Sequence, residues 1–270
     1  MDSKEEEVET INGAPEEQPL SKKQRKKLEK RQKFLEMKKN LREKERAKRK
    51  LKKIQLKEQG IKIEGPSRKQ LKRNKADIES ASFQIAIDLS FDEFMAEKDL
   101  SSLCSQLLRI YTANRRAKKP IPIHFTGLKE DTRMYQQLEK NEGWKHWDVM
   151  ANDKSYSEIF DKDKIVYLTS ESENVLDKFE DGHCYVIGGI VDHNSQKGLT
   201  LDLAEKQGIK TARLPLSEYV SITSRSVLTV NQCFEILLGV SEGKSWKEIL
   251  MEVLPQRKMP KLKTQVSDES

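Results

Sequence analysis

The sequence lacks the features that mark secreted, membrane-spanning and zinc-binding proteins. Its 270 residues include only three cysteines, which lie far apart, with no CxxC pair and no histidine at ligand spacing: Cys104, Cys184 and Cys233. This spacing favours buried thiols in a reducing compartment and argues against any metal site. No apolar run approaches the length of about 18 residues that a membrane span needs, and the residues after Met1 are acidic. We therefore expect a soluble protein without a secretory signal.

Several enzyme signatures are also missing. The segment after the first strand candidate reads IDLSFDEF and has no GxGxxG, which disfavours a dinucleotide site or a standard Rossmann methyltransferase pocket. The chain has no Walker loop, no GxSxG and no HxE with a distal PCxxC, so kinases, hydrolases and zinc deaminases lose their usual support. It also shows no Arg/Ser-rich, acid-poor leader, which argues against mitochondrial import.

Positive charge is concentrated in one segment. The net charge is +7, yet residues 21–75 hold 25 Lys/Arg against 6 Glu, and residues 1–20 and 76–270 each carry −6. Residues 1–20 are acidic and contain two prolines, which predicts a disordered tail. Residues 21–58 are rich in helix formers but poor in apolar side chains, which predicts a long solvated helix, whether formed in the free protein or only on binding. Such a basic arm most often binds phosphate backbones; a nuclear localisation signal is the alternative.

From Ser82 onward the pattern changes to alternating strands and helices. The apolar strand candidates are Phe83–Leu89, Ile121–Phe125, Ile165–Leu168, Cys184–Ile187 and Thr211–Leu214. Four of the helices between or after them are expected to open with capping boxes at Ser90–Glu93, Ser155–Glu158, Ser170–Glu173 and Ser245–Glu248. The alternation predicts an α/β fold with a parallel sheet covered by helices on both faces. Ligands bind beyond the carboxyl ends of such strands, so residues 168–172, 188–194 and 213–216 should share one rim.

The most informative stretch is residues 185–198, YVIGGIVDHNSQKG. An apolar run breaks there at two glycines, and a carboxylate, an imidazole and an amide follow. ARLPL (residues 212–216) and VLTVNQCFEILL (residues 227–238) come next in the chain. Together these pieces resemble the tRNA guanine-9 N1-methyltransferases, a branch of the knotted SPOUT methyltransferases. The resemblance covers about residues 83–258.

The resemblance implies an organisation and an activity. It implies a SPOUT domain over residues 76–258 with a C-terminal trefoil knot, preceded by an acidic tail (1–20) and a basic RNA-binding arm and linker (21–75), and followed by a disordered tail (259–270). It also implies methyl transfer from S-adenosylmethionine to N1 of guanine 9 in tRNA. The family resemblance further implies a monomer, and the HN pair after Asp192 favours the branch found in the nucleus or cytoplasm.

Residue roles follow from the same resemblance. Asp192 matches the family's candidate proton acceptor; it either has a pKa raised by burial or mainly orients the target base, and His193 is a rival base. The remaining candidates for holding the methyl donor are Leu168, Thr169, Gly188, Gly189, His193, Asn194, Lys197, Leu214, Pro215, Val227, Leu228 and Thr229. The glycines would let the backbone approach the donor closely, although a plain turn at the strand end is an alternative.

Two further groups are candidates for contact with tRNA. Asp88 and Gln106 match family positions near the target base, although Asp88 could equally be a turn or capping acid. The segment RIYTANRRAKK groups basic residues with an aromatic one, a composition that suits a phosphate-contacting helix end; the basic residues are Arg109, Arg115, Arg116, Lys118 and Lys119. A solvated helix C-terminus would look the same. The competing function is a non-catalytic tRNA-binding or tRNA-processing scaffold that retains the fold, which should have lost the donor-binding rim.

Overall fold

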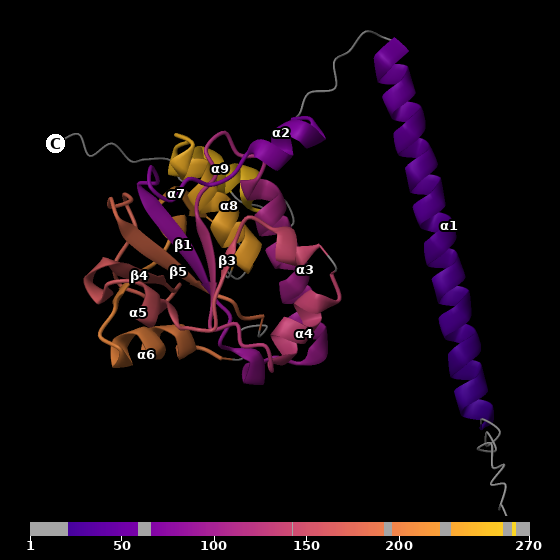
Figure 1. Cartoon of the computed structure of the whole chain (residues 1–270), viewed down its shortest axis with the longest axis horizontal. Helices are drawn as coiled ribbons and strands as arrows, with labels where there is room; N and C mark the ends of the chain where they lie inside the picture. Colours follow the sequence, from indigo (N-terminus) through magenta and orange to yellow (C-terminus); the bar gives the residue numbers. More distant parts are fainter. Residues whose placement is uncertain are drawn as a thin grey trace, which may run out of the picture. The chain divides into compact units, whose positions relative to one another are not determined.

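The computed structural model describes residues 21–58, 66–141, 143–191, 196–221, 228–255 and 261–262. The chain divides into two compact units, residues 1–65 and residues 66–270. In the first unit, α1 (Lys22–Glu58) is a helix of 37 residues (Figure 1). Its described large apolar residues, such as Leu28, Phe34 and Leu51, are between 43% and 60% exposed. The helix propensity of its residues, and not the burial of an apolar face, therefore accounts for α1.

The second unit is built on a parallel sheet of six strands. The strands are β1 (Phe83–Asp88), β2 (Ile123–Thr126), β3 (Met150–Ala151), β4 (Ile165–Leu168), β5 (His183–Gly188) and β6 (Lys210–Ala212). Their order across the sheet is β3-β2-β1-β5-β4-β6, and every neighbouring pair is parallel. The register aligns Asp88 with Gly188 and Leu168 with Ile187, so β1, β5 and β4 end at one edge.

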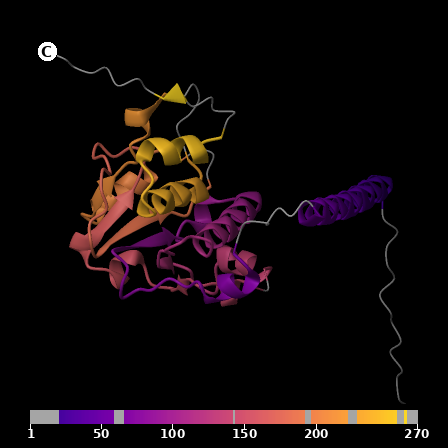
Figure 2. The ribbon, with the colours of Figure 1, turned by 90° about the horizontal axis from the view of Figure 1, so that it is seen from above.

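Helices cover both faces of this sheet, which confirms the expected fold class. The larger core lies under α3 (Glu97–Asn114), α8 (Val230–Ser241) and α9 (Trp246–Val253), and the last two lie side by side in Figure 2. The smaller core on the opposite face is closed by α5 (Tyr156–Ile159) and α6 (Leu199–Lys206). The shorter elements are α2 (Arg68–Arg73), α4 (Arg133–Glu139), α7 (Leu216–Tyr219), the 3₁₀ turns η1 (Asp92–Phe94), η2 (Trp144–His146) and η3 (Lys162–Lys164), and the antiparallel pair β7 (Val220–Ser221) and β8 (Lys261–Leu262). The trefoil knot stays a prediction.

Two of the four expected capping boxes are present, at Ser155–Glu158 and Ser245–Glu248. The other two predictions were wrong. Ser90 does not open a helix, because its N–H donates to Asp88 Oδ1 and only the 3₁₀ turn η1 follows before α3 begins at Glu97. Ser170 lies in a turn and no helix follows it; nearby, Ser172 Oγ is hydrogen bonded to Thr211 Oγ1. Capping boxes instead open α2, at Ser67–Gln70, and α8, at Thr229–Gln232.

Strand bounds differ from the expected ones by a few residues. The strand expected from Ile121 begins at Ile123, because Pro122 has no N–H to donate to a neighbouring strand. The last strand of the sheet is Lys210–Ala212 and does not extend to Leu214. Strand β8 falls within residues 259–270, the segment expected to be a disordered tail.

Candidate active site

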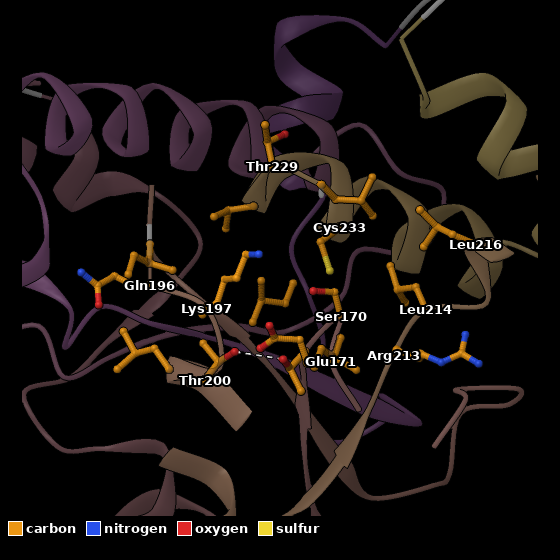
Figure 3. Close-up of a pocket in the computed structure, with 18 of the residues that line it drawn as sticks. Ser170, Glu171, Gln196, Lys197, Thr200, Arg213, Leu214, Leu216, Thr229 and Cys233 are labelled. Atoms are coloured by element: carbon orange, nitrogen blue, oxygen red, sulfur yellow. Dashed lines mark hydrogen bonds between the residues drawn. The ribbon is translucent and has the colours of Figure 1, made fainter. Parts of the chain in front are cut away.

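A cavity of about 260 Å³ lies beyond the carboxyl ends of β4, β5 and β6 (Figure 3). Parallel strands end at a common edge there, and the loops that follow them diverge to leave a crevice. The cavity is lined by Leu168–Glu171 after β4, Ile187, Gly188 and Ile190 around the end of β5, Gln196, Lys197, Leu199 and Thr200 at the start of α6, Arg213, Leu214, Leu216 and Ser217 after β6, and Leu228–Val230 and Cys233 at the start of α8. Segments far apart in the sequence therefore build one site.

Seven residues singled out from the sequence line this cavity: Leu168, Thr169, Gly188, Lys197, Leu214, Leu228 and Thr229. Figure 3 shows Lys197 and Thr229 reaching it from different elements. Gly189 and Pro215 are neighbours of the lining but are not part of it. Asp192, His193, Asn194 and Val227 lie outside the described residues.

The two glycines at the end of β5 are explained by packing. A Cβ on Gly189 would lie 2.6 Å from the carbonyl oxygen of Asp88 and 2.7 Å from Leu89 Cδ2. A Cβ on Gly188 would lie 3.0 Å from Thr200 Cγ2 and 3.2 Å from the Tyr167 hydroxyl. The close approach at Gly189 is therefore to β1. Gly188 has crowded neighbours as well, and it also lines the cavity.

The polar wall of the cavity is held by contacts between β4 and α6. Thr200 Oγ1 donates to Thr169 Oγ1 at 3.0 Å, and the Gly198 N–H donates to Glu171 Oε2 at 2.6 Å. Gly198 has a φ of +78°, which favours glycine at the N-cap of α6. These contacts fix the loop after β4 against the segment that contains Lys197.

A second clamp fixes the short helix α7 at the cavity. Arg213 Nη1 lies 2.7 Å from Glu218 Oε1 and donates to Ser217 Oγ at 3.1 Å. Arg213 is partly buried and Glu218 lies nearer the surface, with side-chain exposures of 27% and 35%. Because Ser217 and Leu216 line the cavity, this pair fixes one wall.

Sequence reasoning missed several lining side chains, namely Ser170, Glu171, Gln196, Thr200, Arg213, Ser217 and Cys233. The expectation that residues 168–172 and 213–216 share a rim pointed to three of them, but no motif singled them out. Cys233 lies one helical turn after Thr229, and burial raises the pKa of its thiol to about 12, so it is neutral at physiological pH.

Asp88 and Gln106, the two candidates for contact with the target base, have structural partners. Asp88 is 2% exposed, accepts hydrogen bonds from the Ser90 N–H and the Tyr167 hydroxyl, and has a pKa raised by burial. Gln106 Oε1 accepts the backbone N–H of Val230 at 2.9 Å, which fixes the first turn of α8. These contacts support the turn-acid reading of Asp88 and make Gln106 a support for the cavity wall.

The basic residues at the end of α3 form a candidate nucleic-acid interface. Arg109, Arg116, Lys118 and Lys119 are exposed, and the Arg115 guanidinium lies over the Tyr111 ring at 5.1 Å. Asn74 Nδ2 donates to the carbonyls of Arg115 and Ala117 at 3.0 and 2.8 Å. This contact brings α2 and the residues that follow it to the same surface, with exposed Lys69, Lys72, Arg73 and Lys75. We call this set the α2–α3 basic surface.

Two features are absent from the described part of the chain. Within it, no group of three or more His, Cys, Asp or Glu side chains is arranged to hold a metal ion. No helix among those same residues is long and apolar enough to cross a membrane.

Comparison with known proteins places the chain in one family. A family model described as tRNA (guanine(9)-N(1))-methyltransferase TRM10/TRM10A matches residues 18–259. The Drosophila melanogaster tRNA (guanine(9)-N(1))-methyltransferase Trmt10A is 44% identical over 210 residues, which are 77% of this chain and 66% of that protein. The Schizosaccharomyces pombe tRNA (guanine(9)-N1)-methyltransferase is 40% identical over 195 residues, which are 70% of this chain and 62% of that protein. The chain thus spans no more than about two thirds of either relative.

A solved structure agrees with the fold. The crystal structure of full-length spTrm10 in complex with SAH has a TM-score of 0.60 and 38% sequence identity to this chain. The similarity covers 65% of this chain and 96% of the solved one. A Trm10 from Thermococcus kodakaraensis, at a TM-score of 0.50 and 22% identity, shares the fold.

Proposed function

The chain belongs to the tRNA (guanine(9)-N(1))-methyltransferase TRM10/TRM10A family, and from this premise we propose that it methylates N1 of guanine 9 in tRNA. The methyl donor would be S-adenosylmethionine. The observation that carries the proposal is the cavity at the ends of β4, β5 and β6, whose lining contains seven residues assigned to the donor from the sequence. A scaffold without activity would have no need to keep this lining.

The lining fits the chemistry of the donor. An apolar part, formed by Leu168, Ile187, Leu214 and Leu228, suits the adenine ring, and a polar part suits the ribose and the amino-acid end. Lys197 supplies a cation for the carboxylate, and Thr169 and Glu171 supply hydrogen-bonding groups for hydroxyls. Gly189 and Pro215 would act from behind the lining, and His193, Asn194 and Val227 keep their assignment beside the donor. When bound, the donor supplies an electrophilic methyl group on a sulfonium.

The protein's own task is to present N1 of guanine and to accept its proton. N1 carries a proton at neutral pH, so alignment of the base and removal of that proton are both required. We assign this task to Asp192, which follows the end of β5 by four residues, as an orienting group with partial base character. Alignment can supply much of the rate, and a base adds about 10²- to 10⁴-fold.

We propose that positively charged side chains bind the tRNA. The basic arm and the α2–α3 basic surface both offer exposed Lys and Arg side chains to phosphates, and hydrogen bonds to phosphates position a nucleic acid without reading its sequence. Asp88 and Gln106 would act only through the chain segments that they hold. The assignment of tRNA as partner comes from the family.

The same proposal covers assembly and location. We infer that the protein is a monomer, because the family resemblance favours a monomer. We also infer that it is located in the nucleus or cytoplasm, with which the basic arm is consistent. Light scattering on the purified protein tests the first, and localisation of tagged full-length and arm-deleted chains tests the second.

Donor binding separates the enzyme from the scaffold. Titration of the protein with S-adenosylhomocysteine should give saturable binding, and Lys197→Met should weaken that binding roughly tenfold, as expected for loss of a charged contact. Labelled methyl donor should then transfer its label to unmodified tRNA transcripts. Tight binding of tRNA with no binding of S-adenosylhomocysteine would establish the scaffold.

A further inference from the structure

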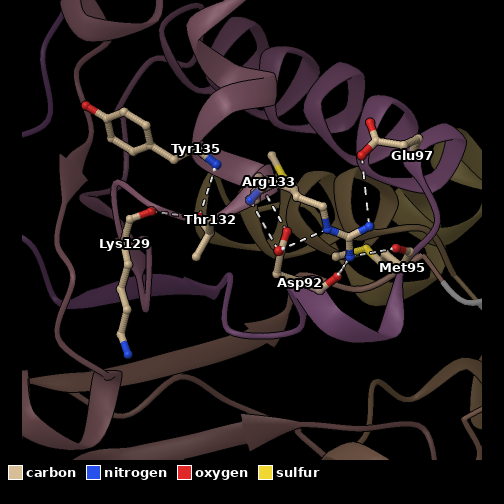
Figure 4. A network of polar contacts seen from close by, with 8 residues as sticks. Asp92, Met95, Glu97, Lys129, Thr132, Arg133 and Tyr135 are labelled. Carbon is tan, nitrogen blue, oxygen red and sulfur yellow. Dashed lines mark hydrogen bonds and ion pairs between the residues drawn. The ribbon is translucent and has the colours of Figure 1, made fainter.

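A polar network begins at Arg133, in the first turn of α4 (Figure 4). Arg133 Nε donates to Asp92 Oδ2 at 3.3 Å, and Nη2 donates to the carbonyl oxygens of Asp92 and, at 3.0 Å, Met95. The Asp92 carboxylate also accepts the backbone N–H groups of Arg133 and Met134, at 3.2 and 2.9 Å. One guanidinium thus ties the segment of residues 92–95 to the start of α4.

Met95 connects this network to the end of β5. Its side chain is 3% exposed, and its Sδ accepts the backbone N–H of Val191 at 3.4 Å. A second anchor lies two residues earlier, where the Gly189 N–H donates to the carbonyl of Asp88 at 2.8 Å. The chain that leaves β5 therefore rests on the segment that leaves β1, and Val191 is followed directly by Asp192.

We propose that Arg133 is a positioning residue for methyl transfer. By holding the Met95 carbonyl it fixes the thioether against the Val191 N–H, and so sets the point at which the chain enters the Asp192 segment. The inference rests on the proposed function, in which Asp192 acts on the target nitrogen. It adds to that function a residue outside the lining of the donor cavity.

Arginine is suited to this task. Its planar fork reaches a carboxylate and two carbonyls at once, whereas a lysine ammonium is a single point of charge. The α4 helix does not depend on the guanidinium for its own cap, because Thr132 Oγ1 and the Asp92 carboxylate already accept N–H groups of its first turn. The side chain of Arg133 therefore acts mainly on residues 92–95.

The test uses full-length Arg133→Met and Met95→Leu, which keep the bulk of each side chain. Both should lower kcat roughly tenfold, since small misplacement of a reacting group is costly in rate. The Kd for S-adenosylhomocysteine should change by much less than kcat, because neither Arg133 nor Met95 lines the cavity. Hydrogen exchange of a peptide spanning residues 189–197 should become several-fold faster, with exchange of residues 134–139 unchanged.

Two controls isolate the guanidinium fork. Glu97→Gln removes only an exposed partner, 3.9 Å from Arg133 Nη1 and 70% exposed, and should leave kcat unchanged. Arg133→Lys keeps the charge and should not restore kcat. The proposal is overturned if Arg133→Met has normal kcat, if its kcat, Kd and thermal unfolding change together as in general destabilisation, or if exchange of residues 189–197 is unaffected. Absence of methyl transfer by the wild type would instead contradict the proposed function. The exchange measurement would still show whether Arg133 positions the segment that follows β5.

Discussion

Tyr167 and Asp88 are hydrogen bonded within the sheet, although β5 lies between their strands. The Tyr167 hydroxyl donates to Asp88 Oδ2 at 3.1 Å, and the two residues are 0% and 2% exposed. Burial raises the pKa of the Asp88 carboxyl, whereas the hydrogen bonds from Ser90 and Tyr167 lower it. This pair closes the end of β1 beside Gly188, at the edge of the donor cavity.

Removing the tyrosine hydroxyl should destabilise the fold. Tyr167→Phe leaves one oxygen of a buried carboxyl without its donor, and we expect a loss of about 1–3 kcal/mol in the free energy of unfolding. Urea denaturation measures this loss. Tyr156→Phe is the matched control, because its hydroxyl bonds to the partly exposed Gln207 at 3.0 Å and water can replace that contact. Equal losses in the two variants would contradict the account of Asp88.

His124 should make stability depend on pH. It is 8% exposed, its Nε2 lies 2.6 Å from Gln84 Oε1, and burial lowers its pKa from 6.5 to about 4. Between these values the unfolded imidazole binds a proton and the folded one does not. The contribution of His124 to the free energy of unfolding should therefore be complete above pH 6.5. It should be lost as the pH falls toward 4, which lowers the free energy of unfolding by up to about 3 kcal/mol.

The comparison with His124→Asn isolates this effect. Asparagine keeps a hydrogen bond to Gln84 within reach but does not titrate, so the variant should show a shallower loss of stability between pH 6.5 and 4. Parallel pH curves for the two proteins would show that His124 is not the source.

The Arg213–Glu218 ion pair should control affinity for the donor. Glu218→Gln loosens α7, whose Leu216 and Ser217 line the cavity, and we expect the Kd for S-adenosylhomocysteine to rise about three- to tenfold, as for a partly buried charged contact. Calorimetric titration measures this. Glu252→Gln is the control, since its ion pair with Lys244 belongs to the α9 end and does not touch the cavity. An unchanged Kd for Glu218→Gln would show that α7 needs no such clamp.

The basic arm should dominate the dependence of tRNA binding on salt. Removal of residues 1–65, the first compact unit, should weaken tRNA binding at least about tenfold and flatten the plot of log K against log salt, because fewer counterions are released. Binding of S-adenosylhomocysteine should not change. The full-length triple variant Lys38→Gln, Lys39→Gln, Lys44→Gln should give an intermediate slope. A slope that survives deletion unchanged would assign the grip to the α2–α3 basic surface.

Much of the fold and part of the site could be read from the sequence. The five apolar runs gave the strands of the sheet apart from β3, whose two residues are too short to carry a periodic signal. Because the carboxyl ends of parallel strands lie at one edge of the sheet, the sequence also predicted that residues 168–172 and 213–216 lie close together. The resemblance to the family supplied the choice of donor and substrate, which no pattern in the chain could have supplied.

Side-chain partnerships were beyond reach of the sequence. Ser90 and Glu93 have capping-box spacing, but the Asp88 carboxyl and the Arg133 guanidinium take up the local backbone groups, and both contacts depend on packing. The reason for Gly189 was likewise hidden, since only the register of β1 with β5 shows that a Cβ would meet Asp88. Gln106 and Val230 are 124 positions apart, and their hydrogen bond follows from the packing of α3 on α8.

The most direct test of the central claim is the position of the transferred methyl group. Purified protein and labelled methyl donor would be incubated with unmodified tRNA transcripts carrying G, A or C at position nine, and the modified nucleotide would be identified by mass spectrometry. We predict label on N1 of guanine 9, at a rate that Asp192→Asn lowers by about 10- to 100-fold, less than the full contribution of a general base. Label elsewhere in the tRNA, or tight tRNA binding with no label on any transcript, would contradict the account.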